Sequence, residues 1–212
     1  MDIIEQIRDE AQKRFADARG SHDWEHTLRV YNLCLHIGNK EHADIQTLQI
    51  AALLHDIGRI IQDESNGKIC HAEKGAEMAQ ELLAPFNLDI NILTNVIHCI
   101  KTHRYRGTNI PTSIEAKILF DSDKLDSIGA VGIGRAFLFA GEIGAKLHNT
   151  DIDITSTEAY TKEDTAYREY VVKLQYIKDR MLTDEGKRLA QERHDVMVNF
   201  FNRLNQEVVG AL

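Results

Sequence analysis

The chain has 212 residues, of which 43% are hydrophobic and 27% are charged, the composition of an ordinary globular protein. A single domain of this length buries roughly 70% of the surface of its unfolded chain, so a core needs no disulfide staples. The net charge of −8 argues against a nucleic-acid duplex as the main partner, because duplex binding depends on a cationic surface. A small phosphorylated ligand remains compatible with this charge, since it needs only local positive charge.

The cysteine pattern and the hydropathy pattern bear on the compartment. Cys34, Cys70 and Cys99 form no CxxC pair and leave an odd count, which favours a reducing compartment over a disulfide framework. The charged, amphipathic amino terminus contains no apolar signal core. No run of about eighteen uncharged apolar residues occurs, so we expect no membrane-spanning segment. These features predict a cytoplasmic protein.

Apolar residues recur at helical spacing through most of the first half of the chain, and only two prolines occur in the whole sequence. This spacing predicts helices over residues 3–18, 23–38, 44–60, 71–86 and 87–103. The segments 62–70 and 104–113 lack this periodicity and are predicted to be loops.

The second half continues the helical pattern. A Ser-x-Glu start signal predicts a helix over residues 113–129, and a glycine-rich helix follows over 130–147. After a loop over 148–164, two long helices are expected over 166–181 and 184–206. With no repeat or linker, we predict one all-α domain over residues 1–212. The last two helices make a homodimer plausible.

The adjacent residues His55 and Asp56 stand in the apolar run IAALLHDIGRII. Neighbouring side chains point about 100° apart on a helix, so amphipathic packing alone cannot bury both. Burying a carboxylate costs on the order of several kcal/mol unless a cation or a hydrogen-bond network compensates. A metal ion would compensate, and His26 and Asp123 are further candidate ligands on other predicted helices. A structural His–Asp pair without a metal is the alternative.

This ligand set has a defined chemistry. Two neutral imidazoles and two carboxylates carry a formal charge of −2, which one divalent cation cancels. Mixed nitrogen and carboxylate ligands suit Mn²⁺, Fe²⁺, Zn²⁺, Ni²⁺ or Mg²⁺. Four protein ligands on an octahedral ion leave positions open, where the ion lowers the pKa of bound water and polarises a phosphoryl oxygen. The set therefore predicts hydrolysis.

The segments HDWEHTLRV, AALLHDIGR and ILFDSDKLDSIGAVGIGRAF resemble the HD-domain superfamily of metal-dependent phosphohydrolases, over about residues 20–140. The resemblance implies an HD-domain helical bundle with additional helices over about residues 150–212. It also implies a metal held by His26, His55, Asp56 and Asp123. Asp123 is preferred to Asp121 because the family's aspartate typically precedes a basic residue and a leucine.

The resemblance also suggests a second metal ion. His71 and His103 follow the His–Asp pair at intervals similar to those in binuclear members, where Asp56 would bridge both ions. In the alternative, His71 and His103 bind substrate phosphate or act as a general acid. His98, five residues before His103, competes with it for this position.

Positive charge near the site must meet the phosphates. The candidates are Arg59, Lys101, Lys124 and Arg135. Arg135 stands in an apolar helix and needs a partner, either substrate phosphate or an internal acid such as Asp126.

Asp126 lies one turn after Asp123, where it could orient a water or contact the substrate. The predicted catalytic residues are thus Asp56, Lys124 and Asp126. Substrate binding is assigned to Lys101, Arg135, His71 and His103. Arg104 and Arg106 follow His103 and are expected to be solvated or to gate the site.

These predictions converge on a metal-dependent phosphohydrolase acting on a small phosphorylated molecule. The resembled branch, similar to nucleotide pyrophosphohydrolases, suggests a nucleotide cleaved between its α and β phosphates. A phosphomonoesterase or a cyclic-nucleotide phosphodiesterase would use the same site. A metal- or nucleotide-binding sensor without turnover is the alternative outside the enzymes.

Overall fold

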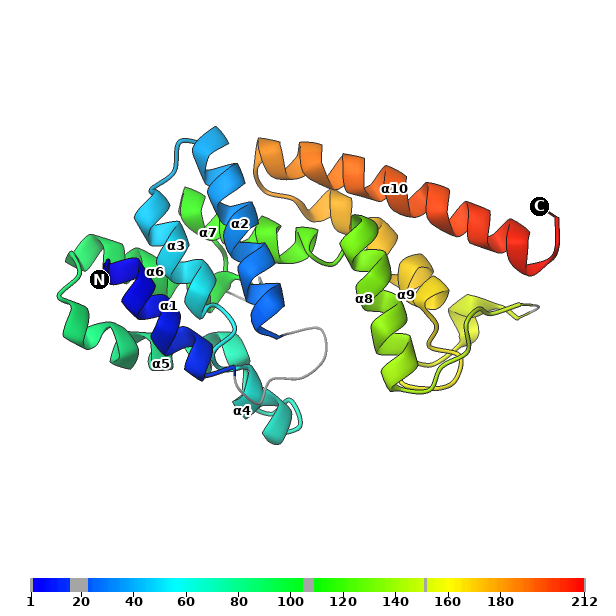
Figure 1. Cartoon of the computed structure of the whole chain (residues 1–212), viewed down its shortest axis with the longest axis horizontal. Helices are drawn as coiled ribbons and strands as arrows, with labels where there is room; N and C mark the ends of the chain where they lie inside the picture. Colours follow the sequence, from blue (N-terminus) through cyan, green and yellow to red (C-terminus); the bar gives the residue numbers. More distant parts are fainter. Residues whose placement is uncertain (1, 16–22, 105–108, 151, 212) are drawn as a thin grey trace. The chain divides into compact units, whose positions relative to one another are not determined.

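The structure, a computed structural model, describes residues 2–15, 23–104, 109–150 and 152–211. These residues form helices and turns without a β-strand, which confirms the all-α prediction (Figure 1). Among the described helices, none combines the length and the apolar character needed to cross a membrane. Cys34, Cys70 and Cys99 are free thiols.

The chain divides into two compact units. The first consists of Met1–Asp123 and Leu182–Gly186, and the second of Lys124–Met181 and Lys187–Leu212. The expected single domain stays a prediction. The helices that begin within Met1–Asp123 are α1 (Ile3–Lys13), α2 (Trp24–Lys40), α3 (Ile45–Leu54), α4 (Arg59–Glu64), α5 (His71–Leu83), α6 (Ile90–Thr102) and α7 (Ile114–Leu125), with a 3₁₀ turn at Ala84–Phe86.

Helix α3 is the centre of the first unit. It packs against α1, α2 and α6 (Figure 1). Ile50, Leu53 and Leu54 are fully buried, and the helix has hardly a polar face. Helices that are apolar all round belong in a core. Because His55 and Asp56 follow α3 directly, the chain delivers them into this core.

Side-chain caps fix where the site-bearing helices begin. The Asp23 side chain accepts a hydrogen bond from the backbone N–H of His26 at 2.8 Å, so α2 starts one turn before that histidine. Asp44 caps α3 in the same way through Thr47. Such caps stabilise a helix start by about 1 kcal/mol.

The prediction of one continuous helix over residues 44–60 is wrong. α3 ends at Leu54, and the His–Asp pair lies in a turn over residues 55–58 that precedes α4. The turn packs tightly against α5: a Cβ atom on Gly58 would lie 2.5 Å from the carbonyl oxygen of His71 and 2.7 Å from the backbone nitrogen of Gly75. The turn brings Asp56 beside the start of α5.

Several predicted boundaries also differ from the structure. α1 ends at Lys13, and residues 16–18 of that predicted helix lie outside the described residues. α6 begins only at Ile90, because Asn87 is left-handed (φ 47°) and Asp89 caps the helix. α4 extends to Glu64, into the segment predicted to be a loop.

The short segment Leu182–Gly186 belongs to the first unit because Asp121 holds it. Both Asp121 carboxylate oxygens accept backbone hydrogen bonds, from Leu182 at 2.9 Å and from Thr183 at 2.8 Å. The Thr183 hydroxyl donates a third at 2.6 Å. Asp121 is fully buried and serves as an anchor of α7.

The second unit contains the carboxy-terminal helices. They are α8 (Gly129–Glu142), α9 (Ala166–Val172) and most of α10 (Asp184–Val208), with 3₁₀ segments at Ile154–Ser156 and Leu174–Arg180. The predicted helix over 166–181 is therefore broken. Lys173 interrupts it with φ −143° and ψ −56°, outside the helical region.

Candidate metal centre

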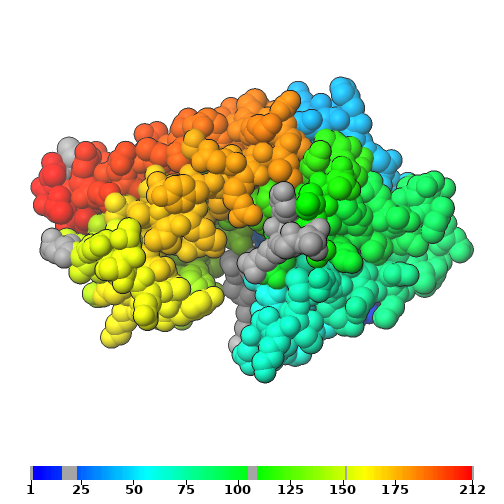
Figure 2. All heavy atoms as spheres, turned by 180° about the vertical axis from the view of Figure 1, so that it is seen from behind, coloured from blue at the N-terminus to red at the C-terminus, as the bar shows by residue number. Residues whose placement is uncertain are grey.

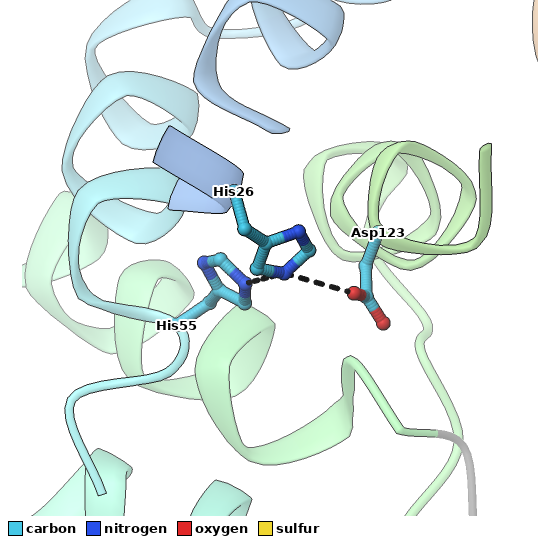
Figure 3. A group of neighbouring side chains, drawn as sticks. All are labelled: His26, His55 and Asp123. Carbon is cyan, nitrogen blue, oxygen red and sulfur yellow. Dashed lines mark hydrogen bonds and ion pairs between the residues drawn. The ribbon is translucent and has the colours of Figure 1, made fainter. Parts of the chain in front are cut away.

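The first group of potential ligands comes from three places in the first unit. His26 lies in the first turn of α2, His55 follows α3, and Asp123 lies near the end of α7 (Figure 3). The Nε2 atom of His26 is 3.4 Å from Nε2 of His55 and 3.5 Å from Oδ1 of Asp123. We call these three residues the first cluster. Both histidines are fully buried, while Asp123 is partly exposed.

Asp56, His71 and His103 form the second cluster, which is buried throughout. His71 is the first residue of α5 and His103 directly follows α6. Their Nε2 atoms are 3.1 Å apart. Oδ1 of Asp56 is 3.2 Å from Nε2 of His71 and 3.6 Å from Nε2 of His103.

The carboxylate of Asp56, a member of the second cluster, also faces the imidazoles of the first. While Oδ1 faces the second cluster, Oδ2 lies 3.8 Å from the Nε2 atoms of both His26 and His55. One buried carboxylate therefore has an oxygen toward each pair of imidazoles. This is the juxtaposition expected of a ligand shared between two ions, and it arises because the turn after α3 reaches α5.

The ring nitrogens show why a cation fits here. Nδ1 of His55 lies 2.8 Å from the carbonyl oxygen of Ala52, and Nδ1 of His103 lies 2.6 Å from that of Ile100. A carbonyl only accepts hydrogen bonds, so each Nδ1 donates and each Nε2 carries a lone pair when the ring is neutral. These lone pairs therefore lie beside the other potential metal-ligand atoms of the clusters, which are imidazole nitrogens and carboxylate oxygens. A divalent cation with nitrogen and carboxylate ligands satisfies this arrangement.

Burial disfavours protonation of one histidine in each cluster, His55 and His71. Burial lowers the pKa of His55 to about 4, against an opposing contribution from Asp56. Burial lowers the pKa of His71 to about 2, and the nearby cations Arg59 and Arg104 act in the same direction. The rings of His55 and His71 are therefore neutral near pH 7, the form in which imidazole binds metal ions.

Of the two aspartates weighed in α7, the structure places Asp123 beside the imidazoles. The carboxylate of Asp121 is instead occupied by Leu182 and Thr183. Similarly, the structure brings His103 rather than His98 into the second cluster. His98 Nε2 accepts a hydrogen bond from the backbone of Thr112 at 3.1 Å.

Lys101, predicted to bind substrate, and Lys124, predicted to be catalytic, differ in exposure. Lys101 is exposed on α6, two residues before His103, and Lys124 is half-buried immediately after Asp123. Their proposed contacts with phosphate stay predictions.

In the second unit, Arg135 and Asp126 pair with each other. Nη1 of Arg135 donates to Oδ2 of Asp126 at 2.7 Å and to its carbonyl oxygen at 3.1 Å. Asp126 is buried, and the guanidinium of Arg135 compensates the charge of its carboxylate. Arg193, which the sequence analysis did not single out, donates to the neighbouring carbonyl of Leu125. The predicted roles of Asp126 in catalysis and Arg135 in substrate binding stay predictions.

The expectation that Arg104 is solvated is wrong, and Arg106 lies outside the described residues. Arg104 is half-buried, and its Nη1 donates to Oε1 of Gln62 at 3.1 Å and to Sγ of Cys70 at 3.4 Å. Nη1 of Arg59 lies 3.1 Å from Nδ1 of His71, on the side of the ring away from the cluster. No motif in the sequence marks Gln62, because it stands in a polar segment without periodicity.

Comparisons with known proteins identify the family to which this chain is similar. A model of the HD domain family matches residues 23–128, which include both clusters. YpgQ of Bacillus subtilis is 35% identical over 210 residues, covering 97% of this chain and 94% of YpgQ. A crystal structure of YpgQ in complex with ADP has a TM-score of 0.75 at 33% identity, covering 98% of this chain and 95% of that chain. An HD-superfamily hydrolase from Bacillus thuringiensis has a TM-score of 0.77 at 25% identity, covering 98% and 97%.

Proposed function

Because this chain belongs to the HD-domain superfamily of metal-dependent phosphohydrolases, we propose that it hydrolyses a phosphate ester or anhydride of a nucleotide with the help of divalent metal ions. The observation that carries the proposal is the carboxylate of Asp56, which lies between two groups of imidazole nitrogens in a buried site. A buried carboxylate shared in this way is costly unless cations accompany it.

The chain supplies ligands for two ions. In the proposal, His26, His55 and Asp123 hold one ion together with Asp56, and His71 and His103 hold a second with the same carboxylate. A bound divalent ion acts as a Lewis acid on a phosphoryl oxygen and lowers the pKa of water. We favour Mn²⁺ as the first ion to test, since the ligand set suits it.

The other assigned residues act on substrate and protons. Lys101, Lys124 and Arg135 are proposed to hold phosphate oxygens, because cations stabilise the charge that spreads over them during transfer. Asp126 is proposed to orient a water or to accept its proton. Asp126 and Arg135 form an ion pair in the structure, so in these roles the two side chains would act together.

The nucleotide class is supported by a relative. YpgQ, whose sequence matches along nearly the whole of this chain, was crystallised with ADP. We propose a nucleoside triphosphate as substrate, cleaved between its α and β phosphates to release pyrophosphate. A phosphomonoesterase, a cyclic-nucleotide phosphodiesterase or a non-catalytic sensor would use the same ligands. A cytoplasmic location and a homodimer stay predictions.

The test is a panel of nucleoside mono-, di- and triphosphates and cyclic nucleotides, assayed for phosphate, pyrophosphate and nucleoside monophosphate with Mn²⁺ and again after chelation. The proposal expects Mn²⁺-dependent pyrophosphate release from at least one triphosphate. Phosphate release from monophosphates, or opening of a cyclic nucleotide, would move the assignment to the corresponding esterase. Binding of Mn²⁺ and nucleotide without any product would favour the sensor.

A further inference from the structure

The histidines of the two clusters differ in what holds their outer ring nitrogen. His55 and His103 each follow the last residue of a helix, where backbone carbonyls lack a helical partner. Each ring donates from Nδ1 to the carbonyl three residues earlier, Ala52 or Ile100. The backbone itself therefore sets the tautomer of these two rings.

His71 has the opposite position, as the first residue of α5. The start of a helix presents unpaired N–H groups and no free carbonyls. The Nδ1 atom of His71 therefore needs a side-chain partner, and Oε1 of Gln62 lies 2.9 Å from it. The same oxygen lies 3.2 Å from the backbone nitrogen of His71.

The orientation of the Gln62 amide follows from groups that can only donate. The backbone N–H of His71 and Nη1 of Arg104, at 3.1 Å, both face the same amide atom. Because both are donors only, that atom is the oxygen. Nδ1 of His71 then donates to Gln62, and its Nε2 presents a lone pair toward Oδ1 of Asp56 and Nε2 of His103.

Arg59 favours the other tautomer of the same ring. Its Nη1 lies 3.1 Å from Nδ1 of His71 and is also a donor only, so it can bond this nitrogen only when Nδ1 is unprotonated. In that tautomer Nε2 carries the proton and donates to Asp56, which blocks it as a metal ligand. Gln62 and Arg59 thus compete for one nitrogen.

From this geometry we infer that Gln62 is a positioning residue, which holds His71 in the tautomer and orientation that allow Nε2 to bind the second metal ion. The inference rests on the proposed function, because it assumes that the second cluster binds an ion. Outer partners of metal-binding histidines act in this way, and their loss costs about 10–100-fold in metal affinity or activity. Gln62 is half-buried and directly precedes residues 63–69, most of which are exposed (turquoise in Figure 2).

The test compares Gln62→Met, Gln62→Glu and the matched control Gln49→Met. Methionine keeps the volume but removes the acceptor, whereas glutamate keeps an acceptor for both N–H groups of His71. Gln49 is a half-buried glutamine of α3 that donates to the hydroxyl of Tyr31, away from the clusters. Each variant is titrated with Mn²⁺ by calorimetry, and the imidazole nitrogens of the ¹⁵N-labelled metal-free protein are examined by NMR.

We expect Gln62→Met to weaken the second Mn²⁺ equivalent about 10–100-fold and leave the first unchanged. The NMR signature of His71 should shift toward the tautomer protonated at Nε2. Gln62→Glu should bind the second ion at least as tightly as wild type, and Gln49→Met should match wild type. A structural role alone would lower the melting temperature without this selective loss.

An unchanged second affinity in Gln62→Met overturns the inference. So does a wild-type protein that binds a single equivalent, although the hydrolase proposal survives if that one ion supports turnover. Conversely, if the wild-type protein binds two ions but hydrolyses no nucleotide, the proposed function is wrong. The Gln62 comparison is then still decided by metal affinity alone.

Discussion

Asp56 belongs to the second cluster and also faces the two imidazoles of the first, yet the two clusters are built differently. In the first, His55 is held by the backbone carbonyl of Ala52. In the second, Nδ1 of His71 contacts the side chain of Gln62. The guanidinium group of Arg59 contacts the same nitrogen, and that of Arg104 contacts Gln62. Cations next to a cation site oppose its filling. The difference teaches that two neighbouring ligand sets need not be equivalent, and it predicts a tighter first ion and a weaker, more easily tuned second ion.

Asp56→Asn should weaken metal binding at both clusters at once. An amide at this position keeps the shape but loses the negative charge that faces all four imidazoles. We expect both Mn²⁺ equivalents to weaken and turnover to fall by at least about 10²–10³-fold, as for the loss of other strong electrostatic groups. Calorimetry and the pyrophosphate assay check this.

The control for that change is Asp179→Asn, the same substitution at an exposed carboxylate outside both clusters. It should behave like wild type. Nucleotide turnover that survives in Asp56→Asn would contradict the proposed mechanism as a whole.

His55→Gln and His103→Gln form a matched pair that separates the clusters. Both residues follow a helix and donate Nδ1 to the carbonyl three residues earlier, so the two substitutions remove equivalent local contacts. We expect His55→Gln to abolish the tighter Mn²⁺ equivalent and most of the turnover. His103→Gln should keep one tight equivalent and lose the weaker one.

The measurement is the number of Mn²⁺ equivalents and their affinities by calorimetry, with the melting temperature recorded for each metal-free variant. Identical isotherms for the two variants would show that the clusters are equivalent, against the comparison drawn above.

Much of the fold was predictable because amphipathic helices place apolar residues at a regular spacing in the sequence. The apolar spacing identified α2, α5 and α6 with errors of a few residues. The same spacing failed at residues 55–58, because the apolar run continues through Ile57 into α4 while the backbone turns. The turn follows from the close approach of Gly58 to α5, a contact between distant parts of the chain. Local periodicity does not contain such a contact.

In the site, too, residues marked by a local motif were predicted, whereas those that matter through distant contacts were not. The residues proposed as ligands were named from the His–Asp pair and from the resemblance, and the structure brings them together. Gln62 was missed, and the contact of Arg104 with it was not predicted, because this contact joins residues 42 positions apart in the sequence. A glutamine in a polar segment has no spacing or composition that distinguishes it from a solvated one.

Arg59→Met is the mildest test of the comparison, and its expected effect has the opposite sign. Removing a cation beside His71 should tighten the second Mn²⁺ equivalent roughly threefold to tenfold, since charge repulsion between partly buried cations is worth about 1 kcal/mol at this range. The first equivalent should change less. Calorimetric titration checks the prediction, with Arg203→Met, an exposed arginine paired with Glu207, as the control.

The same variant decides between two roles for Arg59. The sequence analysis named it as one candidate for binding substrate phosphate, and loss of such a contact would raise the KM for the nucleotide while Mn²⁺ affinity stays constant. The structure instead directs Nη1 toward Nδ1 of His71, on the side of the ring away from the cluster. A tighter second ion with an unchanged KM follows from this position, because the guanidinium then acts on the metal site through the imidazole and not on the substrate. A raised KM with unchanged Mn²⁺ binding would return Arg59 to the phosphate-binding residues and leave Arg104 as the cation that opposes the second ion.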